Sequence, residues 1–242
     1  MVTIPTRPGV TQSFLVAEMD GLKPEAVALL YIGGSGNINL RVEDGRVTFG
    51  DRNFLPRSRS EFARNAILPV VMDAPSDQRD LPDHYRMGGE QTADARGVIA
   101  ELKKRYPGLP VYVVGTSRGT LSAAYVSRAL GDDIAGVVLT SSLFTSRRRG
   151  GSASLQGFDY ASIKVPLLFV HHREDACDMT PYSRAAGLAD RYPLVSVNGG
   201  KPAESGPCDP LSAHGFLGKE AETVDAIAAW MLKRPLPKEI GK

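Results

Sequence analysis

Six short apolar runs, alternating with segments of helical spacing, constrain the fold of this chain more than any other feature. The runs are almost continuously hydrophobic and lack the polar alternation of a strand with one face in water. Strands of this kind suit a parallel sheet that helices cover on both faces. The predicted strands are residues 26–32, 67–72, 111–114, 134–139, 165–170 and 194–197.

Apolar residues at helical spacing fill the intervals between these strands. The predicted helices are residues 57–65, 89–105, 118–130, 181–192 and 221–233. Regular alternation of strand and helix predicts an α/β fold with a doubly wound, mostly parallel sheet and helices on both faces. Residues 13–18 are expected to add an antiparallel edge strand. No internal repeat or low-complexity linker interrupts the pattern, so we expect a single domain over residues 1–242.

The charge and hydropathy patterns exclude two classes of partner. The net charge is only +2, and the basic residues are scattered apart from Arg147, Arg148 and Arg149. Because so short a basic run is typical of a solvated loop, we expect no nucleic-acid partner. No window approaches eighteen uninterrupted apolar residues, so we expect no membrane span. We expect a monomer or a small homo-oligomer that acts on a small molecule.

Residues 111–120, VYVVGTSRGT, end a predicted strand in Gly-Thr-Ser-Arg-Gly and lead into a predicted helix. Small residues two positions before and after Ser117 allow strand and helix to approach without a side-chain clash. The sharp turn would hold the Ser117 hydroxyl out beyond the sheet. The backbone N–H of Arg118 would lie at the helix N-terminus, where it can stabilise an oxyanion. We therefore favour a nucleophilic Ser117 over a simple tight turn.

A serine hydroxyl needs a base, and the base needs an orienting carboxylate. Among the four histidines, His214 is the preferred base because it lies in the last loop before the final predicted helix. His84 is expected in a surface loop. His171 and His172 follow a strand directly, so we expect packing or hydrogen-bonding roles for them.

Asp175 is the preferred acid. It lies in the tight turn after the strand at 165–170, although its neighbours Glu174 and Asp178 remain alternatives. The order serine, aspartate, histidine along the chain is the order expected for a catalytic triad in this architecture.

With these residues the chain resembles the α/β-hydrolases over nearly its whole length. His-His-Arg-Glu-Asp at 171–175 resembles the family's His-Gly-x-x-Asp acid turn, with histidine in place of glycine. Ile-Gly-Gly-Ser-Gly-Asn at 32–37 resembles the loop after its third strand, which supplies the second oxyanion N–H. The resemblance implies that Ser35, with Gly34 beside it, is that donor. The interval 140–164 is too short for the large cap domain of many members.

These residues together predict a serine hydrolase that cleaves a small acyl ester through an acyl-enzyme, without a metal ion or an organic cofactor. A thioester, an amide or a short peptide would use the same machinery. A binding module of the same fold, without catalysis, is the alternative from another functional class. A phosphate cradle at 33–36 is disfavoured, since no Lys-Ser or Lys-Thr follows it.

The two cysteines flank the proposed acid and base. Cys177 lies two positions after Asp175 and Cys208 six before His214, so convergence of these loops would allow a disulfide. The bond would close a loop of about 30 residues and contribute roughly 3–4 kcal/mol. Two free cysteines are the alternative, and a metal site would have too few ligands.

A structural disulfide indicates an oxidising compartment. We therefore expect a periplasmic or secreted protein whose signal peptide is absent from this chain. The chain begins without a signal peptide, which leaves a cytoplasmic protein as the alternative.

Several side chains near the expected site have two interpretations. Arg118 would face an anionic substrate group or form an ion pair outside the site. Asp73 and Asp77 would line the pocket or, as we favour, cap the segment that follows them. A set of aromatic residues would form pocket walls or pack in the core: Phe49, Phe54, Phe144, Tyr182 and Phe216.

Overall fold

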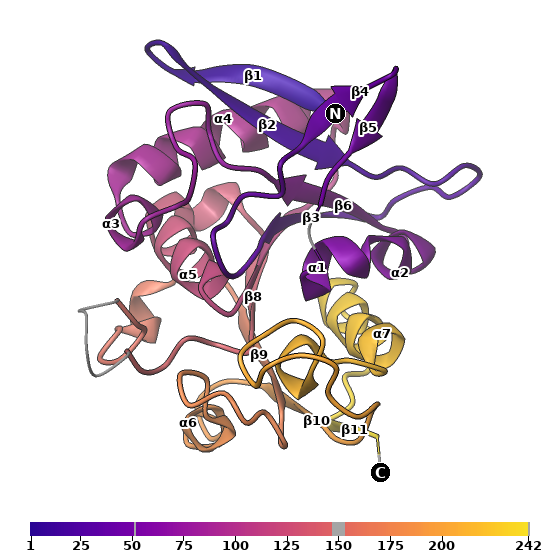
Figure 1. The fold of residues 1–242 in the computed structure, drawn as a ribbon, viewed down its shortest axis with the longest axis vertical. Helices are drawn as coiled ribbons and strands as arrows, with labels where there is room; N and C mark the ends of the chain where they lie inside the picture. Colours follow the sequence, from indigo (N-terminus) through magenta and orange to yellow (C-terminus); the bar gives the residue numbers. More distant parts are fainter. Residues whose placement is uncertain (51, 147–152, 242) are drawn as a thin grey trace.

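A computed structural model describes residues 1–50, 52–146 and 153–241, and in these ranges nine strands form one sheet (Figure 1). The strand order is β1-β2-β6-β3-β7-β8-β9-β10-β11. The strands are β1 (Val2–Arg7), β2 (Val10–Val16), β3 (Ala26–Tyr31), β6 (Ile67–Met72), β7 (Val111–Thr116), β8 (Gly136–Thr140), β9 (Leu167–His172), β10 (Leu194–Val197) and β11 (Glu239–Ile240). The basic triplet at 147–149 lies outside the described residues.

The six apolar runs form the parallel part of the sheet, from β6 through β3 to β10. Nearly every residue of these strands is buried. The prediction of a mostly parallel sheet between two layers of helices is confirmed. The two-residue strand β11 extends the sheet beyond the predicted strands.

The antiparallel edge differs from the prediction. The strand expected at 13–18 is β2, which begins at Val10, pairs antiparallel with β6 and is not the edge. The edge is β1, antiparallel to β2. Its sequence, VTIPTR, alternates between exposed and half-buried residues and includes Pro5. Proline is tolerated in an edge strand, but it weakens the sequence signal for one.

Helices cover both faces of the sheet. One layer comprises α3 (Asp83–Arg86), α4 (Gly89–Arg105), α5 (Gly119–Leu130) and α6 (Tyr182–Ala186). The other comprises α1 (Phe54–Arg57), α2 (Arg59–Arg64) and α7 (Glu220–Met231). Alternate residues of β3 belong to the two cores, with Val27 and Leu29 on the α4 and α5 side and Ala28 and Leu30 on the α7 side.

Two predicted helices are shorter than expected. The helix predicted at 57–65 corresponds to α2, which runs only from Arg59 to Arg64, and the short helix α1 that ends at Arg57 was not predicted. The helix predicted at 181–192 ends at Ala186, directly before Gly187. Glycine has a low helix propensity, and the segment continues as turns to the next strand.

A two-stranded hairpin, β4 (Arg41–Glu43) and β5 (Arg46–Thr48), lies between β3 and α1 and was not predicted. It projects from the rest of the molecule (Figure 1). Its strands have three residues each and are largely exposed, so they show no apolar run. The dipeptide Asp44-Gly45 between them is a typical hairpin signal and could have identified it.

Between β8 and β9 the described residues contain one short 3₁₀ turn, Tyr160–Ser162, and no cap domain. Among the helices of the described residues, none combines the length and the apolar character needed to cross a bilayer.

Candidate active site

Ser117 lies at the sharp turn between β7 and α5 and has a backbone φ of +52°. This left-handed conformation is strained for a residue with a Cβ, and it persists only where the surroundings fix it. The Ser117 N–H donates to the Thr140 carbonyl oxygen at the end of β8, at 3.1 Å. The neighbouring strand therefore helps to hold the turn.

The glycines around Ser117 are required by close backbone packing. A Cβ on Gly119 would lie 2.1 Å from the Tyr31 carbonyl oxygen, and one on Gly115 would lie 2.5 Å from the Gly119 carbonyl oxygen. Helix α5 thus begins in direct contact with the end of β3. The spacing of small residues seen in the sequence is a steric requirement of this turn.

The loop after β3 lies against Ser117. A Cβ on Gly33 would be 2.9 Å from that of Ser117. The Gly36 N–H donates to the Gly33 carbonyl oxygen at 3.2 Å, and the turn that this bond closes gives Gly34 a φ of +58°. Glycine adopts this conformation at no steric cost. The Ser35 carbonyl oxygen accepts from Leu81 N–H at 2.7 Å, so the loop is held on both sides.

Three backbone N–H groups near the Ser117 hydroxyl, those of Gly34, Ser35 and Arg118, have no acceptor among the described residues. Gly34 and Ser35 line the same cavity as Ser117. Unpaired N–H groups that face one point can stabilise a negatively charged oxygen. The geometry is therefore compatible with the oxyanion donors expected from the sequence.

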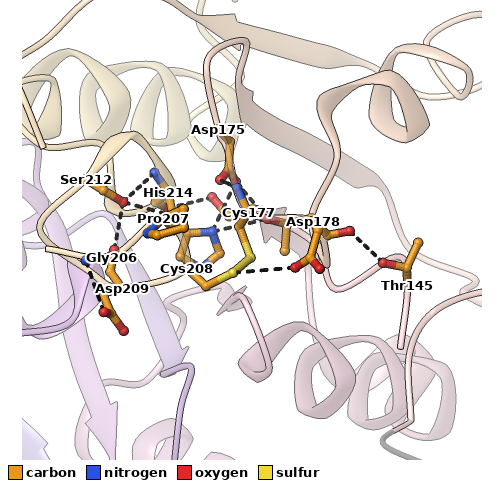
Figure 2. Close-up of a disulfide and its surroundings, with 12 residues drawn as sticks. Thr145, Asp175, Cys177, Asp178, Gly206, Pro207, Cys208, Asp209, Ser212 and His214 are labelled. Atoms are coloured by element: carbon orange, nitrogen blue, oxygen red, sulfur yellow. Dashed lines mark hydrogen bonds and ion pairs between the residues drawn. A yellow bond between two sulfur atoms is a disulfide. The ribbon is translucent and has the colours of Figure 1, made fainter. Parts of the chain in front are cut away.

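The loops that contain Asp175 and His214 meet at the same edge of the sheet (Figure 2). His214 Nδ1 lies 3.0 Å from Asp175 Oδ2, and the two side chains are 5% and 0% exposed. His214 Nε2 is buried without a hydrogen-bond partner in the described residues. Ser117 and His214 line one cavity, but no hydrogen bond joins them in the part of the chain that the structure describes.

Sequence reasoning missed Thr180, a fully buried hydroxyl between the acid and the base. Its Oγ1 donates to Asp175 Oδ2 at 2.8 Å and lies 3.2 Å from His214 Nδ1. The Cys177 N–H donates to Asp175 Oδ1 at 3.0 Å, so both carboxylate oxygens have donors. No sequence pattern we used links a threonine to an acid five positions earlier.

The other two candidate acids do not contact His214. Glu174 and Asp178 are both exposed. Glu174 donates its backbone N–H to His172 Nδ1, and the Asp178 carbonyl oxygen accepts from the Thr145 hydroxyl. Of the three carboxylates, Asp175 is the one bonded to the imidazole of His214.

The predicted disulfide between Cys177 and Cys208 is present, with Cα atoms 4.6 Å apart. It ties the loop after β9 to the loop before α7 (Figure 2). Cys208 also lies in the wall of the Ser117 cavity. Asp178 approaches both sulfur atoms. Because the sulfurs are bonded to each other, they are not free thiolates for a metal ion.

The remaining histidines lie apart from the Ser117 cavity. His171 is buried and stacked on Phe144, with ring centroids 5.3 Å apart, and its Nε2 accepts from Ser142 N–H at 3.0 Å. Burial lowers the pKa of His171 to about 3, so its imidazole is neutral. His172 Nε2 donates to the Gly199 carbonyl oxygen at 2.8 Å, and His84 is exposed in α3.

The Arg118 side chain forms an ion pair outside the cavity. It donates to Asp83 Oδ1 at 2.5 Å and to the Gly34 carbonyl oxygen at 3.2 Å. Burial opposes ionisation of Asp83, but hydrogen bonds from Arg118 and from Ala153 N–H outweigh it and leave the pKa of Asp83 lowered. Of the two interpretations of Arg118, the structure supports the ion pair.

Asp73 caps no following segment, and that favoured interpretation is wrong. Its carboxylate oxygens accept from the N–H groups of Ile38 and Leu40, at 2.8 and 2.9 Å. It therefore holds the earlier loop after β3, because strand β6 ends beside that loop. Asp77 instead pairs with Arg7 on β1, at 2.9 Å.

The cavity beside Ser117 has a volume of about 260 Å³ and a mostly polar wall. Besides Ser117, its polar side chains are Ser35, Asn37, Asn39, Asn53, Thr116, Asp209 and His214. Of the five aromatic residues considered for its wall, Phe54 lines the cavity. The ring of Phe216 packs against that of Phe54, with the ring centroids 4.8 Å apart. Phe144 borders a separate cavity of about 430 Å³ between α6 and the loop after β8.

Solved structures of the same architecture match this chain from end to end. Est1E from Butyrivibrio proteoclasticus, solved with ferulic acid bound, matches with a TM-score of 0.64 and 13% identity, over 97% of this chain and 99% of that chain. XC6422 from Xanthomonas campestris is described as an α/β serine hydrolase without a lid. It matches with a TM-score of 0.55 and 13% identity, over 94% of this chain and 90% of that chain. The fold is that of the α/β-hydrolases.

A soluble variant of the monoglyceride lipase from Saccharomyces cerevisiae also has this α/β-hydrolase fold. It matches with a TM-score of 0.62 and 11% identity, over 96% of this chain and 94% of that chain. No family model and no curated protein sequence matches the chain. At these identities the comparisons show the fold, and the chemistry has to be argued from the site itself.

Proposed function

We propose that this chain is a serine hydrolase that cleaves small acyl esters, with Ser117 as nucleophile, His214 as base and Asp175 as acid. The observation that supports this most is the buried His214–Asp175 hydrogen bond. It leaves Nε2 unpaired on a residue that lines the same cavity as the strained Ser117.

The hydrogen bond to Asp175 determines which nitrogen of His214 acts as the base. A carboxylate only accepts hydrogen bonds, so Nδ1 bears the proton and Nε2 has a free lone pair. In the proposed first step, Ser117 Oγ bonds to the acyl carbon while its proton moves to Nε2. Asp175 then stabilises the imidazolium that has formed.

The negative charge on the acyl oxygen would be held by the N–H groups of Arg118 and Ser35, with that of Gly34 adjacent. Collapse of the tetrahedral intermediate breaks the bond to the leaving alkoxide, which takes the proton from His214 Nε2. A water molecule then gives its proton to Nε2 and attacks the acyl-enzyme. Breakdown of this second intermediate releases the acid and restores the Ser117 hydroxyl.

Two observations support an ester as the substrate. The solved structures of this fold described above include a monoglyceride lipase and a protein with a carboxylic acid, ferulic acid, bound. The cavity is small, and its wall offers many hydrogen-bonding groups and few apolar ones. A short acyl group on a polar alcohol fits such a wall better than a long alkyl chain does.

We also propose that the protein works in an oxidising compartment, as a periplasmic or secreted enzyme. The disulfide supports this, since such bonds persist in oxidising surroundings and are rare where thiols are kept reduced.

Labelling with a fluorophosphonate, together with hydrolysis of a panel of p-nitrophenyl esters, tests the proposed reaction. The wild type should be labelled and should hydrolyse short-chain esters, and Ser117→Ala should do neither. Ser60→Ala, a substitution in α2 away from the cavity, is the matched control and should behave as the wild type. Equal labelling of Ser117→Ala and the wild type, or an inactive and unlabelled wild type, would contradict the proposal.

A further inference from the structure

Arg86 on α3 is a fully buried arginine at 1% exposure, and it forms no ion pair with the described residues. Its guanidinium donates to the carbonyl oxygens of Leu81 at 3.1 Å, Gly34 at 3.0 Å and Ile32 at 3.5 Å. It also donates to the Ser122 hydroxyl at 3.3 Å. A buried cation without a carboxylate is costly, so this position needs a physical explanation.

The Gly34 carbonyl oxygen is the point where two arginines meet. It accepts from Arg86 Nη2 at 3.0 Å and from Arg118 Nη1 at 3.2 Å. Arg118 is itself anchored by Asp83. Two cations thus share one carbonyl oxygen and one nearby carboxylate, which leaves a net positive charge behind the loop.

The geometry of the peptide group links this carbonyl to the cavity. The described chain has no cis peptide bond, so the Ser35 N–H points opposite to the Gly34 carbonyl. Hydrogen bonds from a cation to the carbonyl polarise the peptide and make its N–H a stronger donor. The two guanidinium groups therefore act on the N–H that is unpaired beside Ser117.

The packing around Arg86 shows how closely it fits this loop. A Cβ on Gly36 would lie 2.6 Å from Arg86 Nη2. Burial, followed by the charge of Arg118, lowers the pKa of Arg86 to about 9, so the group still bears its charge at neutral pH. The guanidinium is therefore both close enough to donate to the loop and positively charged.

We propose that Arg86 and the side chain of Arg118 are positioning residues that hold and polarise the Gly34–Ser35 peptide as an oxyanion donor. This inference rests on the proposed function. It assigns to the two arginines an effect on the transition state, beyond the attachment of α3 to the loop.

The test compares Arg118→Gln and Arg86→Lys with the wild type, using a p-nitrophenyl acetate substrate and its thionoester. Sulfur accepts hydrogen bonds more weakly than oxygen, so weakening one donor costs the oxoester more than the thionoester. We expect kcat for the oxoester to fall about tenfold in Arg118→Gln while KM changes less than about threefold. The ratio of oxoester to thionoester rates should fall by a similar factor.

Arg96→Gln is the matched control, because it removes an arginine that pairs with an aspartate, Asp133, at 3.1 Å on the exposed side of α4. It should leave both kcat and the rate ratio unchanged. Arg118 is partly exposed, so Arg118→Gln decides the question even if Arg86→Lys does not fold.

The outcomes separate this inference from the proposed function. If hydrolysis depends on Ser117 but Arg118→Gln keeps the wild-type kcat and rate ratio, the positioning role is overturned and the serine hydrolase stands. A fall in kcat with an unchanged ratio also overturns the role, because it indicates a structural effect alone. If hydrolysis does not depend on Ser117, both proposals are overturned.

Discussion

The two halves of the candidate site are held by different kinds of bond. The acid and base loops, with Asp175 and His214, are joined covalently through Cys177 and Cys208. The loop after β3 is held instead by hydrogen bonds: Arg86 and Leu81 donate to its carbonyl oxygens near Ser117, and Asp73 accepts from N–H groups further along it. A covalent link limits how far two loops can separate, whereas bonds to carbonyls determine where the N–H groups point.

This difference indicates what each half has to achieve. The acid and base need a fixed distance between two side chains from loops that are remote in sequence. The loop after β3 needs a fixed direction for backbone dipoles, because donors that are already oriented cost no reorganisation during the reaction. Perturbations should therefore affect the two halves in separable ways.

The strongest loss should come from Asp175→Asn in the acid–base half. An amide cannot stabilise the imidazolium and can hold His214 in the wrong tautomer, so kcat should fall on the order of 10³- to 10⁴-fold. Steady-state kinetics on p-nitrophenyl acetate measure this. Glu174→Gln removes a neighbouring exposed carboxylate and should keep wild-type activity. A loss smaller than about tenfold in Asp175→Asn would remove Asp175 from the proposed mechanism.

Removal of the disulfide should have the next largest effect, and it should appear mainly in stability. The double variant Cys177→Ser, Cys208→Ser loses a cross-link over 31 positions, which corresponds to roughly 3–4 kcal/mol of unfolding free energy. Urea denaturation with and without dithiothreitol measures this. The reductant should lower the stability of the wild type and leave the double variant unchanged.

The same variant sharpens the comparison between the halves. Its kcat should fall, because without the cross-link the loop whose Cys177 N–H donates to Asp175 Oδ1 is held less firmly. Its ratio of oxoester to thionoester rates should stay at the wild-type value. A changed ratio would show that the disulfide also positions the oxyanion donors.

Acidification should lower the free energy of unfolding through His171, which is buried and neutral on the strand that leads to the acid loop. Its folded pKa of about 3 lies below the ordinary value near 6.5, so below pH 6.5 the unfolded chain binds a proton that the folded chain does not. Stability should fall by roughly 1.4 kcal/mol for each pH unit from 6.5 towards 3 through this group. Denaturation series for the wild type and His171→Gln measure it, and equal slopes for the two proteins would refute the prediction.

The smallest effect is expected at Thr180. Thr180→Val removes the hydroxyl that donates to Asp175 Oδ2 while keeping the shape of the side chain, and kcat should fall about tenfold. Thr180→Ser keeps the hydroxyl and should restore most of the activity. Equal rates in all three proteins would show that this hydrogen bond has no role in the reaction.

Sequence reasoning succeeded where a single segment determines the outcome. The apolar runs gave the parallel strands, and the small residues around Ser117 gave the turn that presents it. The cysteine pair is the exception: it joins two loops 31 positions apart, and it was predicted because the proposed acid and base require those loops to converge.

It failed where the decisive contact joins residues that are distant in the chain or have no pattern of their own. Arg86 lies 52 positions from Gly34, and nothing near it in the sequence indicates that it supports that loop. Asp73 resembles a cap for the residues after it, but the free N–H groups that it satisfies precede it by more than thirty positions. The hairpin β4–β5 was missed because its strands have three residues each.

The steric limits at Gly115 and Gly119 also bear on how such an enzyme could be retuned. Neither position has room for even a methyl group, so the geometry that presents the serine is fixed. Asp209 is exposed at the cavity rim, where a larger or less polar side chain extends into solvent. In directed evolution towards more hydrophobic esters, we therefore expect substitutions at this rim and none at the two glycines.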